Sequence, residues 1–110
     1  MSAVALLVDR PEITAPASFD AVIVNRGERP LDYGLAYTIE HWDGECWQKT
    51  DLAPEIFPQI ALIVGPGEIG RPNTVEIPAH VESGFYRVTK DVTEEGSGST
   101  VELVALFQIR

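Results

Sequence analysis

The sequence predicts an all-β sandwich that forms one domain, and three observations support this fold class. Eight prolines and nine glycines interrupt the 110-residue chain at short intervals. These intervals suit strands of about five to nine residues and are too short for helices of typical length. Several segments alternate between apolar and polar residues, and no segment has the apolar spacing of an amphipathic helix. Short strands separated by turns are typical of a sandwich or barrel.

Composition and charge limit the classes of function. The chain has 45% apolar and 23% charged residues, which is typical of a folded domain, and nothing divides residues 1–110 into two domains. Its 17 acidic and 8 basic residues give a net charge of −9. This charge argues against nucleic acid as a partner, because phosphate binding needs a basic patch. Cys46 is the one cysteine, so we expect no internal disulfide.

The first half of the chain predicts three strands. An apolar run over 3–8 is ended by a proline-flanked kink at 11–16. Residues 18–25 alternate in polarity and end in an Asn-Arg-Gly-Glu-Arg-Pro turn, and residues 33–41 alternate again. On the last two strands we expect the core face to carry Phe19, Ala21, Ile23, Leu35, Tyr37 and Ile39.

A hairpin is predicted next, with its return strand over 46–49. The sequence Trp-Asp-Gly-Glu at 42–45 favours a turn, because glycine accepts positive φ angles there. A two-residue loop would pair Glu40 with Trp47 and point Trp47 outward, whereas a three-residue loop would pair Ile39 with Trp47 and bury it. We predict the three-residue loop, since burying such a ring is worth roughly 2–3 kcal/mol.

The second half predicts four more strands. A short apolar run covers 60–64, and after a Gly-Pro-Gly turn a strand covers 74–77. Residues 85–92 and 100–110 form the final pair, joined by the polar, Gly/Ser-rich loop 93–99. The core face of the last strand is expected to carry Val101, Leu103, Ala105, Phe107 and Ile109.

The segment 82–88, Glu-Ser-Gly-Phe-Tyr-Arg-Val, is similar to the immunoglobulin-domain motif Asp-x-Gly-x-Tyr-x-Cys. In that motif the tyrosine stands at a corner, and its hydroxyl bonds back to nearby backbone. The resemblance gives this role to Tyr86. Val88 takes the place of the cysteine, and Ile23 would be its counterpart across the sandwich.

Further motifs extend the resemblance over about residues 18–110. They are Asn25-Arg26-Gly27, Asp43-Gly44-Glu45-Cys46-Trp47, Pro66-Gly67-Glu68, and Gly84, Tyr86, Arg87 and Lys90 in Gly-x-Tyr-Arg-x-x-Lys. With them the chain resembles the bacterial immunoglobulin-like domains of the disulfide-free type. The resemblance implies a Greek-key β-sandwich of about seven to eight antiparallel strands, without catalytic or ligand residues. It also implies a spacer, adhesive or appended interaction module of a cell-surface or secreted protein.

A weaker resemblance concerns the order Asp-Gly-x-x-Trp, Pro-Gly-Glu and Gly-x-Tyr. This order is similar to that in intracellular proteinase inhibitors of Bacillus type, and it implies acidic loops that face a protease.

Residues 1–8 lack the basic region of a signal peptide, and no segment is long enough to cross a membrane. We therefore expect neither a signal peptide nor membrane insertion in this chain.

The residues that could carry chemistry form no catalytic or metal pattern. His41 and His80 are the only histidines, and no metal-ligand spacing relates them. Cys46 and His41 lie on facing arms of the hairpin, but no oxyanion hole or orienting group accompanies them. We expect no catalytic residue, cofactor or metal. Calcium on the loop carboxylates Asp43 and Glu45 is the alternative that stays open.

Two apolar patches are candidate interaction surfaces. Val104 and Leu106 lie on the last strand opposite its core face, unless a loop or the 3–8 strand covers them. Trp42 with Tyr33 near the hairpin end form the second patch.

We predict a non-enzymatic module that acts in protein interaction or as a structural or accessory domain. Its partner would be another protein or a neighbouring domain, and a sheet face or edge could also support a weak homo-oligomer. The alternative is a proteinase-inhibitor-like protein that presents a loop to a protease.

Overall fold

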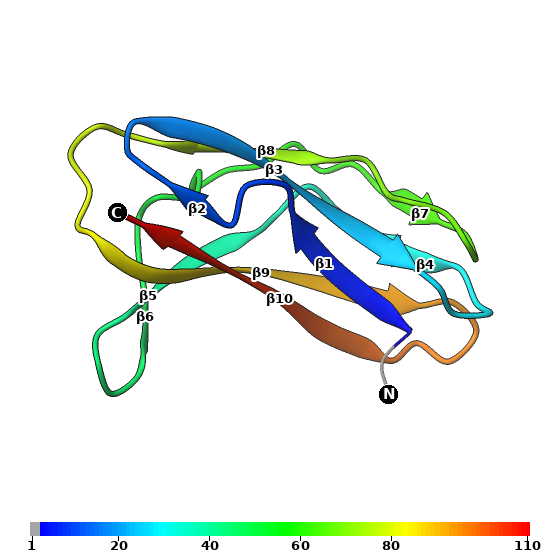
Figure 1. Ribbon diagram of the computed structural model, residues 1–110. Coiled ribbons are helices and arrows are strands. Elements are labelled where there is room, and N and C mark those ends of the chain that lie inside the picture. Colours follow the sequence, from blue (N-terminus) through cyan, green and yellow to red (C-terminus); the bar gives the residue numbers. More distant parts are fainter. Residues whose placement is uncertain (1–2) are drawn as a thin grey trace.

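The structure is a computed structural model that describes residues 3–110, and every regular element within them is a β-strand (Figure 1). None of these residues forms a helix that could span a bilayer. The strands are β1 (Val4–Val8), β2 (Glu12–Ile13), β3 (Ala17–Asn25), β4 (Leu31–Tyr33), β5 (Thr38–Trp42), β6 (Trp47–Lys49), β7 (Leu62–Val64), β8 (Asn73–Ile77), β9 (Gly84–Glu94) and β10 (Thr100–Ile109).

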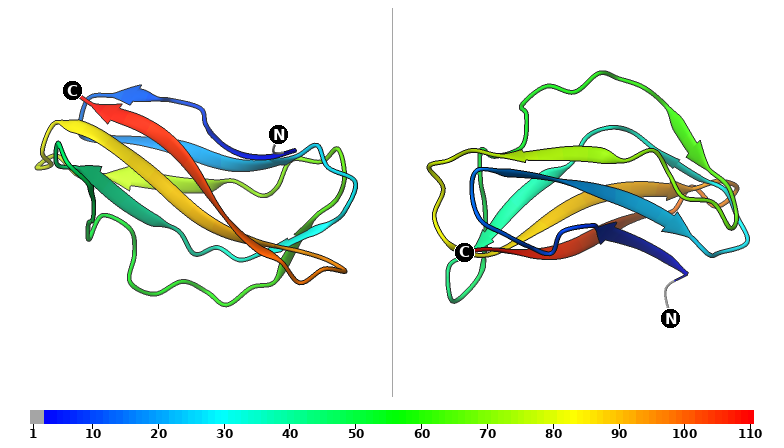
Figure 2. Two further views of the ribbon diagram at one scale, coloured as in Figure 1. Left: turned by 90° about the horizontal axis from the view of Figure 1, so that it is seen from below. Right: turned by 45° about the horizontal axis from the view of Figure 1, so that its top comes forward.

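The strands form two sheets that pack as a sandwich. One sheet has the order β1-β3-β8, and the other has the order β2-β10-β9-β4-β7, with β5 beside β9 and β6 beside β5. Figure 2 shows these layers from two other sides, with the long connection between β6 and β7 running outside the sheets. The predicted all-β sandwich is confirmed.

The strand number and one pairing differ from the prediction. Residues 3–110 form ten strands rather than seven or eight, partly because the chain leaves one sheet after β1, joins the other at β2 and returns at β3. Before the kink β1 pairs with β3, whereas β2, inside the kink, pairs with β10 in parallel rather than antiparallel fashion. The kink contains a cis peptide bond between Ala15 and Pro16.

The core lies between the inner faces of the two sheets. Ile23 and Val88 are both fully buried, each on a different sheet, as expected for the places of the absent disulfide. Phe107 of β10 packs against the Phe19 ring, with centroids 4.8 Å apart. Val101 was expected in the core but is 50% exposed. It lies at the start of β10, where it lines an open hollow instead of meeting the facing sheet.

The predicted tyrosine corner is present. The Tyr86 hydroxyl donates a hydrogen bond to the Glu82 carbonyl oxygen at 2.6 Å, and Tyr86 is buried at the start of β9. Gly84 just before it has a φ of 146°, and a Cβ there would lie 2.9 Å from His41 Nε2. Glycine is therefore required where the chain enters β9.

The strand predicted over 33–41 is interrupted. Tyr33 pairs with Val92 and Thr38 pairs with Thr89, so four residues of one strand face only two of β9. The carbonyl groups in this bulge need partners other than a ladder. Lys90 points inward, is only 4% exposed, and donates from Nζ to the carbonyl oxygens of Gly34 at 2.6 Å and Ala36 at 3.1 Å. Burial lowers the pKa of Lys90 to about 8.

Candidate interaction surface on the outer sheet face

The β5–β6 hairpin has a wider turn than predicted. Trp42 pairs with Trp47 and Glu40 pairs with Lys49, so the three-residue loop that paired Ile39 with Trp47 is wrong. Side chains alternate along a strand, and this register places Trp47 on the outer face together with Trp42 and Glu40.

The carboxylate of Asp43 explains the wider turn. Its Oδ1 accepts hydrogen bonds from the backbone N–H groups of Glu45 at 2.8 Å and Cys46 at 2.9 Å, and its Oδ2 accepts one from Gln48 Nε2 at 3.0 Å. These donors lower the pKa of Asp43 to about 2, the backbone N–H of Cys46 contributing most. Gly44 supplies the positive φ of 103°.

Trp47 is half-buried without entering the core. Its ring tilts against that of Trp42, with centroids 5.3 Å apart. The guanidinium carbon of Arg87 lies 4.6 Å from the centre of the Trp47 ring, within the range of a cation–π contact. Arg87 is itself held by Glu40, whose Oε1 accepts from Arg87 Nε at 2.6 Å. The ring therefore gains contacts on the outer face that replace those expected in the core.

Three further apolar side chains extend this surface along β9 and β10. Leu106 pairs with Arg87, Gln108 with Phe85, and Val104 with Thr89. Phe85 is 57%, Leu106 64% and Val104 45% exposed. Neither β1 nor a loop covers them. We call the five residues Trp42, Trp47, Phe85, Val104 and Leu106 the outer-face patch. Four of them, all but Val104, line a shallow hollow of about 340 Å³.

Residues 2–108 match the family described as bacterial Ig-like domain. The chain belongs to this family. No curated protein matches its sequence. The bacterial Ig-like domain is thus identified by a match over nearly its whole length, in agreement with the resemblance carried by the motifs.

Two solved structures are similar to this bacterial Ig-like domain. An alkylpurine DNA glycosylase from Pseudomonas fluorescens is 16% identical with a TM-score of 0.50, and the match covers 100% of this chain and 31% of that one. A family 123 glycoside hydrolase from Clostridium perfringens is 10% identical with a TM-score of 0.51, covering 99% of this chain and 27% of that one. The domain thus spans about a third or less of these proteins, and the likeness concerns the fold.

The structure brings three of the predicted surface residues together. Val104, Leu106 and Trp42, which we had placed in two separate patches, lie on one outer face. Phe85 was not named as a surface residue from the sequence. The inward-facing residues before and after it on β9 were a usable signal, because they place its own side chain on the outer face. Trp47 was missed because the turn register was wrong.

Tyr33 is not part of an exposed patch. It is 7% exposed, and its hydroxyl oxygen accepts a hydrogen bond from the Arg71 backbone N–H at 2.7 Å. Tyr33 lies on the inner face of β4, opposite Val92 of β9, so pairing it with Trp42 was wrong.

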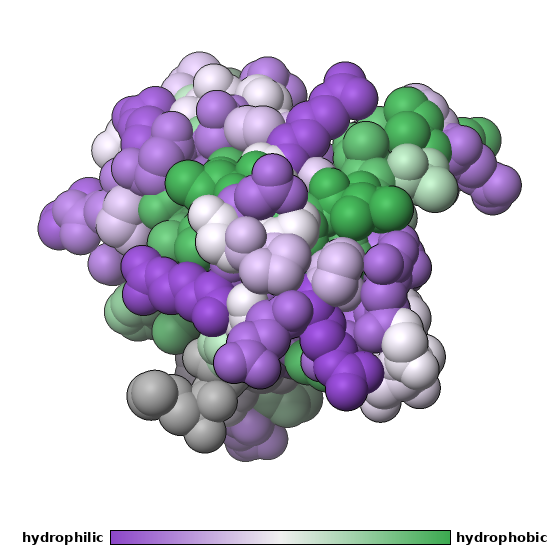
Figure 3. All heavy atoms as spheres, turned by 90° about the vertical axis from the view of Figure 1, so that its right-hand side faces the viewer, coloured by the Kyte–Doolittle hydropathy of each residue, from purple (hydrophilic) through white to green (hydrophobic). Residues whose placement is uncertain are grey.

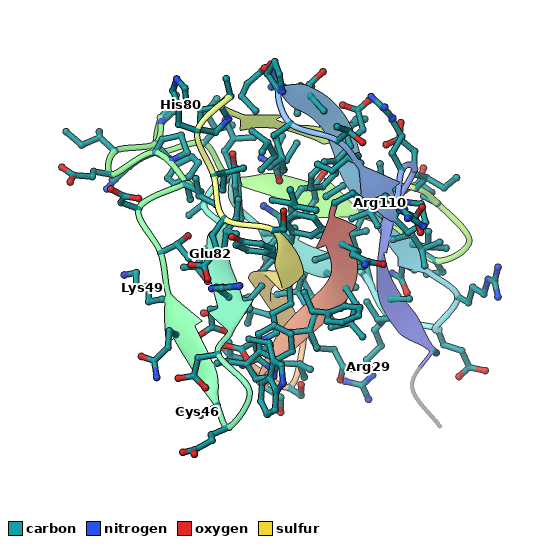
Figure 4. All side chains as sticks on the ribbon, turned by 60° about the vertical axis from the view of Figure 1, so that its left-hand side comes forward. Arg29, Cys46, Lys49, His80, Glu82 and Arg110 are labelled. Carbon is teal, nitrogen blue, oxygen red and sulfur yellow. The ribbon has the colours of Figure 1, made fainter. Side chains whose placement is uncertain are left out.

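The residues with possible chemistry have separate environments. The His41 ring stacks on Tyr86 at 4.4 Å, whereas Cys46 is exposed at the hairpin tip, well away from His80 (Figure 4). The Cys46 Sγ lies 3.0 Å from Gln48 Nε2 and 3.6 Å from Asp43 Oδ2. Residues 3–110 contain no group of three or more His, Cys, Asp or Glu side chains arranged to hold a metal.

The end of the sandwich opposite the hairpin looks different from the patch. Figure 3 shows this end as mainly hydrophilic, with hydrophobic side chains interleaved among polar ones. Asn25 lies buried there. Its Nδ2 donates to the carbonyl oxygens of Arg29 at 2.9 Å and Val64 at 3.1 Å, and its Oδ1 accepts from the Gly27 N–H at 2.9 Å. The Asn-x-Gly motif therefore organises turns at this end.

Proposed function

We propose that this bacterial Ig-like domain is a non-enzymatic accessory module that binds another protein or a neighbouring domain through the outer-face patch. The observation that carries the proposal is the gathering of two tryptophans, a phenylalanine and two aliphatic side chains on one exposed sheet face. Aromatic side chains are enriched at the centres of protein interfaces, and contiguous exposed apolar surface marks such sites.

The geometry of the patch also supports binding, because its tryptophan rings are held by contacts with neighbouring side chains. Trp47 is held between Trp42 and the Arg87 guanidinium, and Arg87 is fixed by its ion pair with Glu40. Phe85 and Leu106 project from the long paired strands β9 and β10. Ordered side chains lose little entropy on association, so more of the contact energy is available for affinity.

Other features support a neighbouring domain as one natural occupant. The matched fold forms 31% of the DNA glycosylase chain and 27% of the glycoside hydrolase chain. The proteinase-inhibitor alternative gains no comparable support, because the family that the chain matches is that of bacterial Ig-like domains.

The proposal can be tested by photo-cross-linking in the cells that carry the protein. A photoreactive phenylalanine analogue is placed at position 106 or, as a matched control, at position 63, since Ile63 is similarly exposed at 62% but lies on β7. We expect one protein or neighbouring domain to be captured from position 106 and not from position 63.

The captured protein is then purified, and its affinity is measured by calorimetry for the wild type, Leu106→Ser and Ile63→Ser. We expect Leu106→Ser to weaken binding at least about tenfold, since central apolar anchors are worth more than about 1.4 kcal/mol. Ile63→Ser should bind like the wild type. Equal affinities for the wild type and Leu106→Ser would overturn the proposal.

A further inference from the structure

The outer face that carries the patch also has an acidic region. Asp91 of β9 pairs directly with Glu102 of β10, and both side chains are exposed. Like charges directly opposite each other on a sheet are destabilising. This pair therefore opposes folding of the isolated domain.

No basic side chain of the described residues forms an ion pair with Asp91 or Glu102. The ion pairs within residues 3–110 are Arg29–Glu94, Arg87–Glu40 and Arg110–Glu12. Lys49 lies opposite Glu40 in the hairpin and lines the same open hollow as Asp91 and Glu102, but it forms no ion pair with either.

The patch therefore lies between two acidic borders. Asp91 and Glu102 form one border, and Asp43 with Glu45 at the exposed hairpin tip form the other. Leu106 lies four positions after Glu102 on β10, which corresponds to about 13 Å along an extended strand.

We propose that the occupant of the patch is a cationic amphipathic segment of another protein or domain. Its apolar side chains fill the hollow beside Trp42 and Leu106, and its Lys or Arg side chains, about 13 Å away, face Asp91 and Glu102. This inference rests on the proposed function and names the chemistry of the partner. A second copy of the chain fits less well, because two molecules of net charge −9 repel each other.

The two tryptophans of the chain, Trp42 and Trp47, both belong to the patch, so tryptophan emission reports its occupancy without a label. The probes are three tryptophan-free synthetic helical peptides, each about 16 residues long. They share one leucine stripe and differ only in carrying Lys, Gln or Glu at all other positions.

We expect the Lys peptide to shift the emission to shorter wavelength in a saturable way. At low salt it should bind about tenfold more tightly than the Gln peptide, because its charges meet the acidic borders. At about 0.5 M salt this advantage should fall below about twofold, since the charges are exposed and screened. The Glu peptide should produce no shift.

Matched variants separate the acidic pair from net charge. Asp91→Asn/Glu102→Gln should lose most of the tenfold preference for the Lys peptide and leave binding of the Gln peptide unchanged. Glu55→Gln/Glu76→Gln changes net charge equally at exposed positions off this face and should keep the preference. Leu106→Ser should weaken both peptides. The first double variant should unfold thermally at or above the wild-type midpoint, because it removes a repulsive pair.

Two outcomes would overturn this inference and leave the proposed function standing. One is equal binding of the Lys and Gln peptides through the patch, and the other is an equal loss of preference in both double variants. A patch that binds only the Gln peptide, or no peptide, also overturns it, and the cross-linking experiment then decides the proposed function separately. Peptide affinities unaffected by Leu106→Ser would count against both.

Discussion

Lys90 shows how one side chain resolves a conflict in the backbone. The bulge between β4 and β5 leaves carbonyl groups without ladder partners, and the Lys90 ammonium donates to two of them. An ammonium group on a core face is unfavourable unless it has such partners. The Gly-x-Tyr-Arg-x-x-Lys motif thus contains a lysine whose role is structural.

A pH-dependent stability follows from the pKa of Lys90, which burial lowers from 10.5 to about 8. Between these values the unfolded chain binds more protons at this site than the folded protein, so stability should rise as pH increases from about 8 towards 9.5. We expect a gain on the order of 1 kcal/mol after allowing for solvent screening, measured by urea unfolding. Burial raises the pKa of Tyr37 and Tyr86. Above about pH 10 the unfolded chain therefore loses these protons before the folded protein does, which lowers stability and opposes the gain.

Lys90→Met should abolish this rise between pH 8 and 9.5. Lys49→Met removes the only other lysine, an exposed one, and should keep the rise. A wild type whose stability is flat or falling over this range would show that Lys90 does not titrate as described.

At the scale of elements, the hairpin depends on turn chemistry more than on the apolar pattern of its strands. Asp43 accepts hydrogen bonds from two backbone N–H groups and one side-chain amide, and this fixes the register that places both tryptophans outside. The structure of β5 and β6 therefore follows from a carboxylate in the loop between them.

The hairpin should respond to acid in a defined range. The pKa of Asp43 is lowered from 3.8 to about 2, so the ionised carboxylate stabilises the turn at and above pH 4, and this stabilisation is lost as pH falls towards 2. We expect the backbone amide resonances of Glu45 and Cys46 to shift with a midpoint near pH 2 in NMR titrations. Asp43→Ala should shift both at neutral pH, whereas Glu45→Gln in the same turn should keep the Cys46 resonance near its wild-type position.

Alternation of apolar and polar residues predicted most elements and their core faces, because period-two burial is a local property. Phe19, Ile23 and Phe107 are buried as expected. The bulge over 34–37 escaped prediction because inward-facing residues keep the same parity on both sides of it, so the apolar pattern continues undisturbed. Trp47 was misplaced because burial of its ring was weighed without the hydrogen bonds of Asp43.

At the scale of the whole molecule, the candidate site depends on which strands are neighbours. Trp42 on β5 and Leu106 on β10 are far apart in sequence, and only β9 between them makes one surface of both. Alternation gives the face of each residue but not the order of strands in a sheet. The sequence therefore predicted Val104, Leu106 and Trp42 as exposed, without predicting that they adjoin.

Asn25 connects the two sheets at the opposite end of the molecule. It belongs to β3 and donates to the Val64 carbonyl oxygen on β7 in the other sheet, in addition to its bonds with Arg29 and Gly27. Asn25→Ala should lower the free energy of unfolding by about 3 kcal/mol, because buried backbone groups lose their partners.

Asn73→Ala serves as the comparison, since Asn73 is only partly buried and donates one bond, to the Leu35 carbonyl oxygen at 2.9 Å. We expect a loss of about 1 kcal/mol there. Both are measured by urea denaturation, and a loss below about 1 kcal/mol for Asn25→Ala would contradict the role given to it.

The burial of Lys90 leaves Lys49 as the lysine side chain open to reagents, and Lys49 lies on the outer face beside the patch. Amine-coupling chemistry that reacts at Lys49, rather than at the amino terminus, would therefore shield the aromatic surface from anything in solution. Immobilisation through a tag at the C-terminus would leave that surface free. An apparent failure to bind after amine coupling would then reflect the orientation of the domain on the chip.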